Sequence, residues 1–386
     1  MHCRNAGIAS IMAEKLKKIR VLIAPLDWGL GHTTRCIPII YELLKNDVDV
    51  IIAGNENQQV LLKQEFPHCT YIYLEGYNVQ YAASARKLFF KMLMQIPRIL
   101  SAMSKEHKWL KKAIKDYQID AVISDDRYGL HYSGVPCVFI THQLLIKNPL
   151  GSLAEKLLQK INYNQINRFH QCWIPDFDDH PNLAGDLSHP QKMPKIPAYY
   201  IGPLTRMKKL ETIIDKNHLL IILSGPEPQR SVFENLIFEQ IISFPGTATI
   251  VRGLPSGMEL PKTADHINIY NHLDRYHLNK EMCKAAFVLC RSGYSSVMDI
   301  HAVGVKSVLI PTPGQTEQEY LADYLMKNHF TVSCSQQQFD LCQMIEKAKG
   351  FEYQINNHLY FSNLPYFIHV FIEKCYQNKQ KALPVC

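Results

Sequence analysis

Short apolar runs alternate with helix-like patterns along the whole chain. In the N-terminal half, the runs typical of buried strands lie at residues 19–24, 48–53, 121–124 and 137–140. Between them, residues 34–44 and 103–115 carry apolar side chains at the spacing of an amphipathic helix. Strands that alternate with helices form parallel sheets covered on both faces. The pattern therefore predicts an α/β unit built on a parallel sheet.

The same alternation begins again after a proline-containing connector, residues 195–211. Further strands are predicted at residues 218–223, 247–251, 266–270, 287–290 and 307–310. The last helical stretch, residues 364–377, has no strand after it and has to pack against a unit already formed. We predict two successive parallel α/β units. A length of 386 residues agrees, because single hydrophobic cores rarely grow that large.

Composition narrows the class of protein. Hydrophobic residues make up 47% of the chain, yet no apolar run reaches the roughly 20 residues that a membrane span needs. The eleven cysteines form no C-x-x-C pair, which argues against a disulfide framework or zinc ribbon and predicts a cytoplasmic protein. The first residues hold too weak an apolar segment for a signal peptide, and we expect Met12 to be the true start.

The net charge of +7 is compatible with several kinds of partner. An anionic membrane surface or a phosphorylated small substrate would suit a surplus of this size. Lysine and arginine are not interleaved with aromatic residues in an RNA-binding pattern, so we expect no nucleic-acid partner. The charge alone does not decide between the remaining partners.

The stretch "PLDWGLGHTTR", residues 25–35, follows the first predicted strand directly. Ligands of open α/β sheets bind beyond the carboxyl ends of strands, where loops lead into helices. Gly29 and Gly31 allow close backbone approach there. A dinucleotide-binding dehydrogenase would need a third glycine at Thr34 and an acid at the end of the second strand, and the first acid is Glu56. The dehydrogenase interpretation is therefore weak.

His32 in this stretch is a candidate general base, because the unperturbed pKa of histidine lies near neutral pH. Asp125 and Asp126 follow another strand of the same unit, so either could be the base, could orient His32, or could cap a helix. His142 follows the next strand and is a weaker candidate of the same kind. We keep all three catalytic assignments, His32, Asp125 and Asp126.

Polar residues also follow three strands of the second unit. Carboxylates there can accept hydrogen bonds from a ribose diol, and amides can bond sugar hydroxyls, while an arginine and free backbone N–H groups suit a diphosphate. The residues predicted to bind a nucleotide-activated sugar, called the donor set below, are Gly29, Gly31, Ser224, Gly225, Arg230, Ser292, Gly293, Ser295, Asp299, Gln315, Gln318 and Glu319.

The segment "CRSGYSSVMDI…LIPTPGQTEQEYLAD" resembles the donor-binding segment of glycosyltransferase family 28. That pattern runs Ser-Gly, five residues, an acid, a strand ending in proline and then a Gln-Gln pair. "GLGHTTR" looks like the family's glycine-rich loop with its histidine. The resemblance implies a GT-B fold, in which two Rossmann-like parallel-sheet domains face a central cleft. It divides the chain into residues 12–205 on the acceptor side, residues 206–362 for the nucleotide sugar, and residues 363–386 as a helix crossing back to the first domain.

The resemblance implies an inverting glycosyltransferase that uses a nucleotide-diphosphate sugar, with UDP the expected nucleotide. The acceptor is a saccharide or a glycolipid, and a lipid-linked saccharide is one form of it. The sequence departs from the family pattern at two places: Asp299 stands where the family has glutamate, and Gln318-Glu319 stands where it has a Gln-Gln pair. Both departures bear on which donor sugar and which nucleotide base are bound. Two alternatives stay open: a non-hydrolysing UDP-sugar 2-epimerase, which shares the fold, and a nucleotide-sugar-binding protein without turnover.

We expect no cofactor and no metal. "PDFDDH", residues 175–180, contains Asp176 and Asp178 in the Asp-x-Asp spacing of metal-dependent glycosyltransferases, but three residues are a weak match and we read it as a polar loop. Residues 86–100 interleave basic and large apolar side chains. They form either an amphipathic helix of the core or a helix that lies in a membrane interface. The second interpretation would place the protein on the inner face of the cell membrane.

Overall fold

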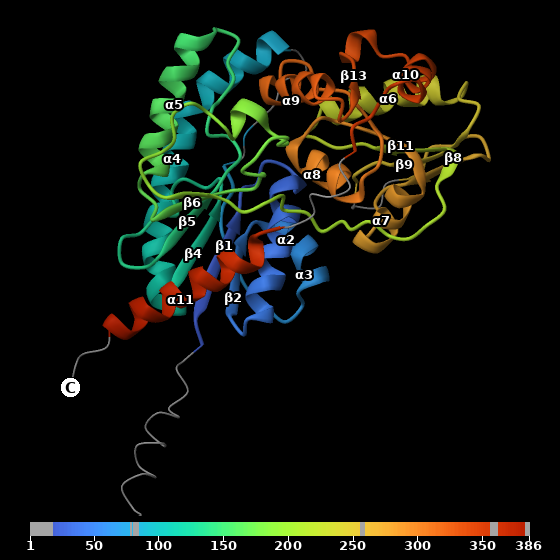
Figure 1. Ribbon diagram of the computed structural model, residues 1–386. Coiled ribbons are helices and arrows are strands. Elements are labelled where there is room, and N and C mark those ends of the chain that lie inside the picture. The colour runs from blue at the N-terminus through green and yellow to red at the C-terminus, as the bar shows by residue number, and fades with distance from the viewer. Residues whose placement is uncertain (1–17, 78, 80–84, 255–258, 356–361, 383–386) are drawn as a thin grey trace, which may run out of the picture.

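The computed structural model describes residues 18–77, 79, 85–254, 259–355 and 362–382, with side chains described outside residues 85–93 and 381–382. The expectation about Met12 lies outside these residues. Within them the chain forms two parallel sheets, each the centre of one half of the molecule (Figure 1). The predicted α/β architecture is confirmed.

The first sheet has the strand order β3-β2-β1-β4-β5-β6-β7. Its strands are β1 (Arg20–Pro25), β2 (Asp49–Gly54), β3 (Thr70–Tyr73), β4 (Ala121–Asp125), β5 (Cys137–Ile140), β6 (Gln171–Ile174) and β7 (Ala198–Tyr200). All neighbouring strands pair in parallel. The order reverses direction between β1 and β4, which makes the gap between their carboxyl ends the expected place for a ligand.

The second sheet has the order β10-β9-β8-β11-β12-β13 and is parallel throughout. Its strands are β8 (Asp215–Ile222), β9 (Thr247–Val251), β10 (Ile267–Tyr270), β11 (Ala285–Cys290), β12 (Ser307–Leu309) and β13 (Val332–Ser333). Here the order reverses between β8 and β11. The two sheets therefore share one topology, with the strand order reversing beside the first strand of each.

Helices cover both faces of each sheet. The first half contains α2 (Leu30–Lys45), α3 (Glu56–Glu65), α4 (Ala85–Tyr117) and α5 (Ser152–Ile166), and the second contains α6 (Gln229–Ile241), α7 (Arg275–Lys284), α8 (Tyr294–Val303), α9 (Thr316–Lys327) and α10 (Leu341–Lys349). α4 and α5 share a core on one face of the first sheet. α2 packs on the other face, in a core that continues through α8 into the second half. The halves are therefore packed together along α2 and α8.

The last helix, α11 (Leu364–Ala382), contributes Ile368 and Phe371 to the core shared with α2. The ring of Phe371 meets Trp173 of β6 edge-on at 5.6 Å between centroids. Figure 1 shows this helix, in red, crossing the N-terminal half. The helix that has no strand after it thus buries its apolar side against the first sheet and its helices.

Sequence patterns located nine strands and missed four. β3, β6, β7 and β13 have four, four, three and two residues. β7 lies inside the stretch that we expected to be only a connector, and it forms the edge of the first sheet. Runs this short carry too few apolar positions to show a period, and edge strands bury little surface.

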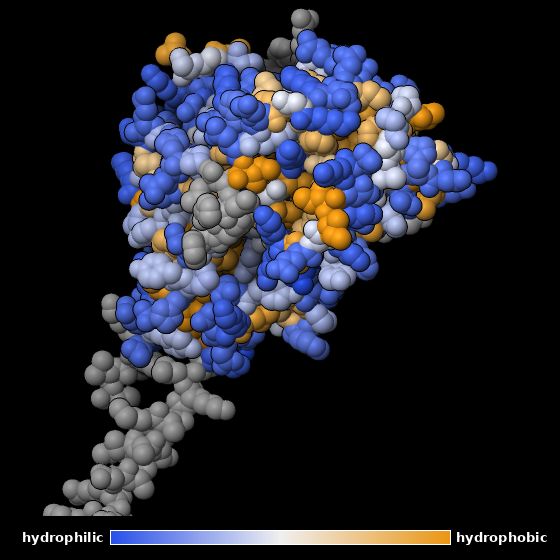
Figure 2. All heavy atoms as spheres, turned by 45° about the vertical axis from the view of Figure 1, so that its right-hand side comes forward, coloured by the Kyte–Doolittle hydropathy of each residue, from blue (hydrophilic) through white to orange (hydrophobic). Residues whose placement is uncertain are grey.

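No helix within the described part of the chain is long and apolar enough to cross a membrane. On the face shown in Figure 2, hydrophilic side chains predominate and apolar side chains gather near its middle. Exposed apolar side chains are the part of such a surface that could contact a membrane.

Candidate functional site

The carboxyl ends of β1 and β4 bring His32, Asp125 and Asp126 together. α2 begins at Leu30, four residues earlier than the sequence pattern predicted, with Gly29 as its N-cap at φ 83°. His32 therefore lies in the first helical turn, where its ring faces the end of β4. Its Nδ1 is 3.2 Å from Asp125 Oδ2 and 3.7 Å from Asp126 Oδ2.

Asp125 is fully buried and is held by Arg35 of α2. The Arg35 Nε–H donates to both carboxylate oxygens at 2.9 Å, and Nη2 donates to Asp125 and to Asp126. Burial would raise the pKa of Asp125, but Arg35 and His32 outweigh it, and this pKa lies below its ordinary value. Asp125 is therefore an acceptor, and His32 must carry its proton on Nδ1. Nε2 is then the basic nitrogen.

His142 lies beside this group and connects it to the second half of the molecule. Its ring stacks on Tyr294 of α8 at 4.1 Å between centroids, with 11° between the planes. One ring nitrogen is 3.3 Å from Arg35 Nη1, and the other is 2.8 Å from Glu317 Oε1 of α9. From the sequence, His142 was only a weak candidate for the site, and Glu317 was not a candidate.

The group of His32, Asp125 and Asp126 has the composition of a metal site, since one ligand atom from each lies within 4.8 Å of the others. Arg35 already bonds both carboxylates, and its positive charge opposes a second cation there. The Asp-x-Asp loop is organised differently. The Asp176 carboxylate accepts hydrogen bonds from the N–H groups of Leu183 and Ala184 and from Ser188 Oγ. Its lone pairs stabilise the loop, as expected for a structural aspartate.

Residues predicted to bind the donor lie at the carboxyl ends of β11 and β12. Gly293 is the N-cap of α8, whose first turn has no side-chain cap. Ser292 is buried and donates its hydroxyl to the carbonyl oxygen of Gln318, while Gln318 Oε1 accepts from Thr312 N. These bonds fix the two loops relative to each other. The Ser292 hydroxyl and the Gln318 Oε1 are therefore engaged within the protein.

Other members of the donor set are open to a ligand. Gln315 is the N-cap of α9, and its buried Oε1 has no hydrogen-bond partner among the described residues. Gly225, after β8, has φ 102° and empty space where a side chain would point. Glu319 is exposed and accepts a hydrogen bond from Gly314 N at 2.8 Å. A sugar hydroxyl would satisfy an orphan amide oxygen of this kind.

Gly31 lies where α2 of the first half contacts α8 of the second. A Cβ atom at Gly31 would lie 2.6 Å from Ser295 Oγ, in the first turn of α8. A side chain at this position would displace the Ser295 side chain at the contact of α2 with α8. The glycine thus brings His32 next to the N-terminus of α8, whose unpaired N–H groups favour negative charge.

Asp299 lies in the second turn of α8 and faces the connector between the halves. Its Oδ1 accepts a hydrogen bond from Thr205 Oγ1 at 2.5 Å. Burial raises the pKa of Asp299 to about 6, although Thr205 and Arg206 act in the opposite direction. The group is thus largely ionised at neutral pH and can accept bonds from a diol.

Arg230, predicted to bind a diphosphate, forms ion pairs within the protein. Its guanidinium is buried and bonds Glu227 at 2.6 Å and Glu234 at 3.2 Å, with further bonds to Arg252 O and Ser231 Oγ. Two carboxylates, Glu227 in the loop before α6 and Glu234 within α6, therefore pair with the cation. The sequence could not reveal this, because glutamates three and four positions away look the same whether or not they pair.

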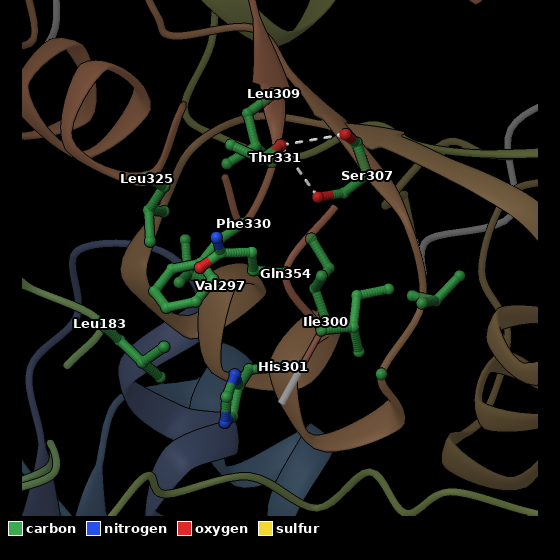
Figure 3. A pocket seen from close by; sticks show the side chains of 13 residues that line it. Leu183, Val297, Ile300, His301, Ser307, Leu309, Leu325, Phe330, Thr331 and Gln354 are labelled. Carbon is green, nitrogen blue, oxygen red and sulfur yellow. Dashed lines mark hydrogen bonds between the residues drawn. The ribbon is translucent and has the colours of Figure 1, made fainter. Parts of the chain in front are cut away.

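A separate pocket lies behind α8, lined by apolar side chains and by His301 (Figure 3). Its volume is about 30 Å³, the space of a single water molecule. Burial lowers the pKa of His301 to about 4, so this ring is neutral. The pocket is too small for a nucleotide sugar and faces away from the strand ends, so it is not part of the candidate site.

Residues 258–358 match the Glycosyltransferase family 28 C-terminal domain. An "Uncharacterized glycosyltransferase" of Methanosarcina acetivorans is 22% identical over 328 residues, covering 78% of this chain and 82% of its own length. The UDP-N-acetylglucosamine--N-acetylmuramyl-(pentapeptide) pyrophosphoryl-undecaprenol N-acetylglucosamine transferase of Histophilus somni is 22% identical over 372 residues, covering 87% and 94%.

The fold resembles that of CalG4, the calicheamicin glycosyltransferase, with a TM-score of 0.58 and 12% identity over 95% of this chain and 97% of that one. The predicted resemblance to family 28 is confirmed, as is the GT-B fold. The chain is an enzyme of the glycosyltransferase class.

Proposed function

We propose that the protein transfers a sugar from a nucleotide-diphosphate donor to an acceptor hydroxyl with inversion, and that His32 is the base. The observation that carries this proposal is the contact of His32 with a buried, ionised Asp125, beside the packing of α2 on α8. Asp125 fixes the tautomer in which Nε2 can accept a proton. No hydrogen bond to Nε2 occurs among the described residues.

In the proposed step, the acceptor oxygen attacks the anomeric carbon from the face opposite the nucleotide. The bond from that carbon to the diphosphate oxygen breaks, and its electron pair stays with the diphosphate. The acceptor proton moves to His32 Nε2, and Asp125 stabilises the imidazolium that forms. The uncapped first turn of α8, at Gly293 and Ser295, offers N–H groups to the charge on the leaving group.

The proposal contains no metal step. Arg35 pairs with Asp125 and Asp126, the carboxylates nearest the base, and Asp176 accepts hydrogen bonds within its own loop. The donor charge would be balanced by helix N-termini instead. We also propose domain limits at residues 12–205 and 206–362, with residues 363–386 crossing back. The first boundary falls between β7 and β8.

UDP is the proposed nucleotide, because the printed name of the Histophilus somni relative specifies a UDP-sugar. Asp299 is proposed to accept hydrogen bonds from the ribose diol. Alanine at this position should weaken UDP binding by about 1–3 kcal/mol, the cost of leaving a polar partner unsatisfied.

The raised pKa of Asp299 makes this binding depend on pH. The carboxylate that accepts the diol is lost as the pH falls through about 6, so UDP affinity should fall between pH 7 and pH 5. The part of the pH dependence that is due to Asp299 should be absent in Asp299→Asn, while the part due to the terminal phosphate of UDP remains. Titration calorimetry at several pH values measures both effects, and an unchanged affinity in the alanine variant would remove the ribose assignment.

A product assay tests the function itself. The protein is incubated with a panel of nucleotide sugars, with and without saccharide and lipid-linked acceptors, and the products are identified by mass spectrometry. A glycosylated acceptor together with free nucleoside diphosphate supports transfer. An isomerised donor formed without acceptor would identify a 2-epimerase, and binding without any product would identify a non-catalytic protein.

The acceptor is proposed to be a saccharide or glycolipid reached at a membrane surface, in keeping with the lipid-linked acceptor in the name of the Histophilus somni relative. The solvent face of α5 exposes Leu153, Leu157 and Ile161 by 81%, 61% and 51%. Exposed Lys156 and Lys160 flank this stripe. An apolar stripe bordered by lysines suits the surface of an anionic bilayer.

α4, which covers the same sheet face, continues this surface. Met94 and Leu100 are 82% and 53% exposed, and Arg98 between them is also exposed. These residues belong to the stretch 86–100 for which a membrane interface was considered; the side chains of residues 86–93 lie outside those described. The surface would hold the protein on the cytoplasmic side of the membrane, where nucleotide sugars are available.

Replacing both Leu153 and Leu157 by serine should weaken binding to phosphatidylglycerol vesicles roughly tenfold or more, because each leucine gains about 1.5–3 kcal/mol on full burial. Vesicle sedimentation measures this. The control replaces Ile213 and Ile242, which are 90% and 78% exposed and lie in the C-terminal half, by serine. Equal vesicle binding by wild type and the α5 variant would refute the membrane surface while leaving the transfer reaction untouched.

A further inference from the structure

A chain of side-chain contacts runs from α9 to the proposed base. Glu317 Oε1 is 2.8 Å from His142 Nε2, and His142 Nδ1 is 3.3 Å from Arg35 Nη1. Arg35 Nε–H donates to Asp125 at 2.9 Å, and Asp125 accepts from His32 Nδ1 at 3.2 Å. The chain begins in the C-terminal half and ends at a catalytic group of the N-terminal half.

The direction of these hydrogen bonds is fixed by chemistry. A guanidinium only donates, so His142 Nδ1 must be the acceptor from Arg35. The ring proton of a neutral His142 then lies on Nε2 and is donated to Glu317. Gln143 donates to the other oxygen of Glu317, and the stack on Tyr294 fixes the ring plane of His142. The donor and the acceptor of each hydrogen bond in the chain can therefore be assigned in only one way.

Glu317 is also tied to the donor loop. It precedes Gln318, which bonds both Thr312 N and Ser292 Oγ, and it follows Thr316, whose hydroxyl donates to the Lys147 carbonyl oxygen of the other half. A ligand that moves the first turn of α9 must move Glu317 as well. The same turn carries Gln315 with its orphan amide oxygen.

We propose that Glu317 is a positioning residue for sugar transfer, through which the donor loop sets the orientation of His32. The inference rests on the proposed function, because it assigns a role within that reaction. In this proposal Glu317 acts through its protein neighbours. It holds His142, which supports Arg35, and Arg35 holds the carboxylate that orients the base.

Glu317→Ala removes the acceptor for His142 and should lower kcat by about 10–10²-fold, the usual cost of losing an outer partner of a catalytic group. UDP affinity should change little. His142→Ala should give a similar loss, and the double variant should lose no more than either single variant, because both act through one chain. Glu317→Gln keeps an acceptor oxygen and should restore most of kcat.

The pH profile gives a second readout. The charged groups around His32 are Asp125 at the end of β4, Asp126 directly after it, Arg35 of α2 and Glu317 of α9, with His142 between the last two. Glu317→Gln removes one negative charge and so disfavours the imidazolium of His32. The acid limb of the kcat profile should move to lower pH.

Glu373 of α11 provides the matched control, because it pairs with His369 at 3.3 Å on the exposed surface. Glu373→Gln should leave kcat and its pH profile unchanged. The inference is overturned if Glu317→Ala keeps wild-type kcat, or if the losses of the two single variants multiply in the double variant. These outcomes are read only if the wild-type protein transfers sugar. If the wild-type protein shows no transfer, the proposed function itself is contradicted.

Discussion

Replacing His32 by alanine is expected to lower kcat by about 10²–10⁴-fold, the share that a positioned acid–base group supplies. The acceptor hydroxyl would then have to lose its proton to water, and no imidazolium would form beside Asp125. Nucleotide affinity should barely change, because the proposed UDP contacts belong to the C-terminal half. Steady-state kinetics with saturating donor, together with UDP titration, separate the two effects.

His369→Ala is the matched control for this variant, since His369 also faces a carboxylate but is 63% exposed on α11. It should retain wild-type kcat. A His32→Ala enzyme with full kcat and a raised acceptor KM would show that His32 only binds the acceptor. Asp126, the less buried of the two aspartates, would then be the preferred base.

Asp125→Asn should have the second large effect, on both rate and stability. The amide cannot hold the His32 tautomer in which Nε2 is basic, so kcat should fall by about 10²–10⁴-fold. It also leaves Arg35, which is 2% exposed, without its main counter-charge. Breaking a buried ion pair on one side lowers the free energy of unfolding by about 3–5 kcal/mol.

Urea denaturation measures the stability of this variant and of a double variant, Asp125→Asn with Arg35→Met. The double variant should regain much of the lost stability, because no uncompensated charge remains buried, but it should regain no activity. If Asp125→Asn unfolds at the wild-type urea concentration, the ion pair is not what holds this part of the site. If it keeps full kcat, Asp125 does not orient the base.

The positions of His32, Asp125 and Asp126 could be predicted because they follow strands. The carboxyl ends of neighbouring parallel strands lie at one edge of the sheet, so residues far apart in sequence meet there. β1 and β4 pair in register, with Pro25 opposite Asp125. The pattern of apolar runs predicted that these side chains follow strands of one sheet, and the strand order β1-β4 brings them together.

Arg35 and Glu317 could not be found in this way. An arginine inside a helix pattern reads as solvent-exposed, and nothing in the sequence shows that Arg35 turns inward to two aspartates. Glu317 reads as an acidic residue at a helix N-terminus, which is favourable in any helix. Its contact with His142 depends on how the two halves pack, and no local pattern encodes that.

For the residues of the donor set, too, the position could be predicted from the sequence but the partners of the side chain could not. Ser292 and Gln318 lie after strands, as predicted. The Ser292 hydroxyl joins the two loops, and the Gln318 side chain bonds Thr312 of its own loop. Arg230 was predicted to bind a diphosphate, and its guanidinium pairs with Glu227 and Glu234. A polar residue at a strand end can serve the ligand or the loop, and only side-chain geometry distinguishes the two uses.

The anomeric configuration of the sugar that is released when water replaces the acceptor tests the central claim most directly, and it requires no knowledge of the acceptor. The enzyme is incubated with an α-linked UDP-sugar, and the first anomer to form is followed by proton NMR before it equilibrates. Inverting transfer with His32 as the base predicts that the β-anomer forms first and that His32→Ala releases it about 10²-fold or more slowly. Release of the α-anomer first, or an equal rate in the variant, would contradict the account.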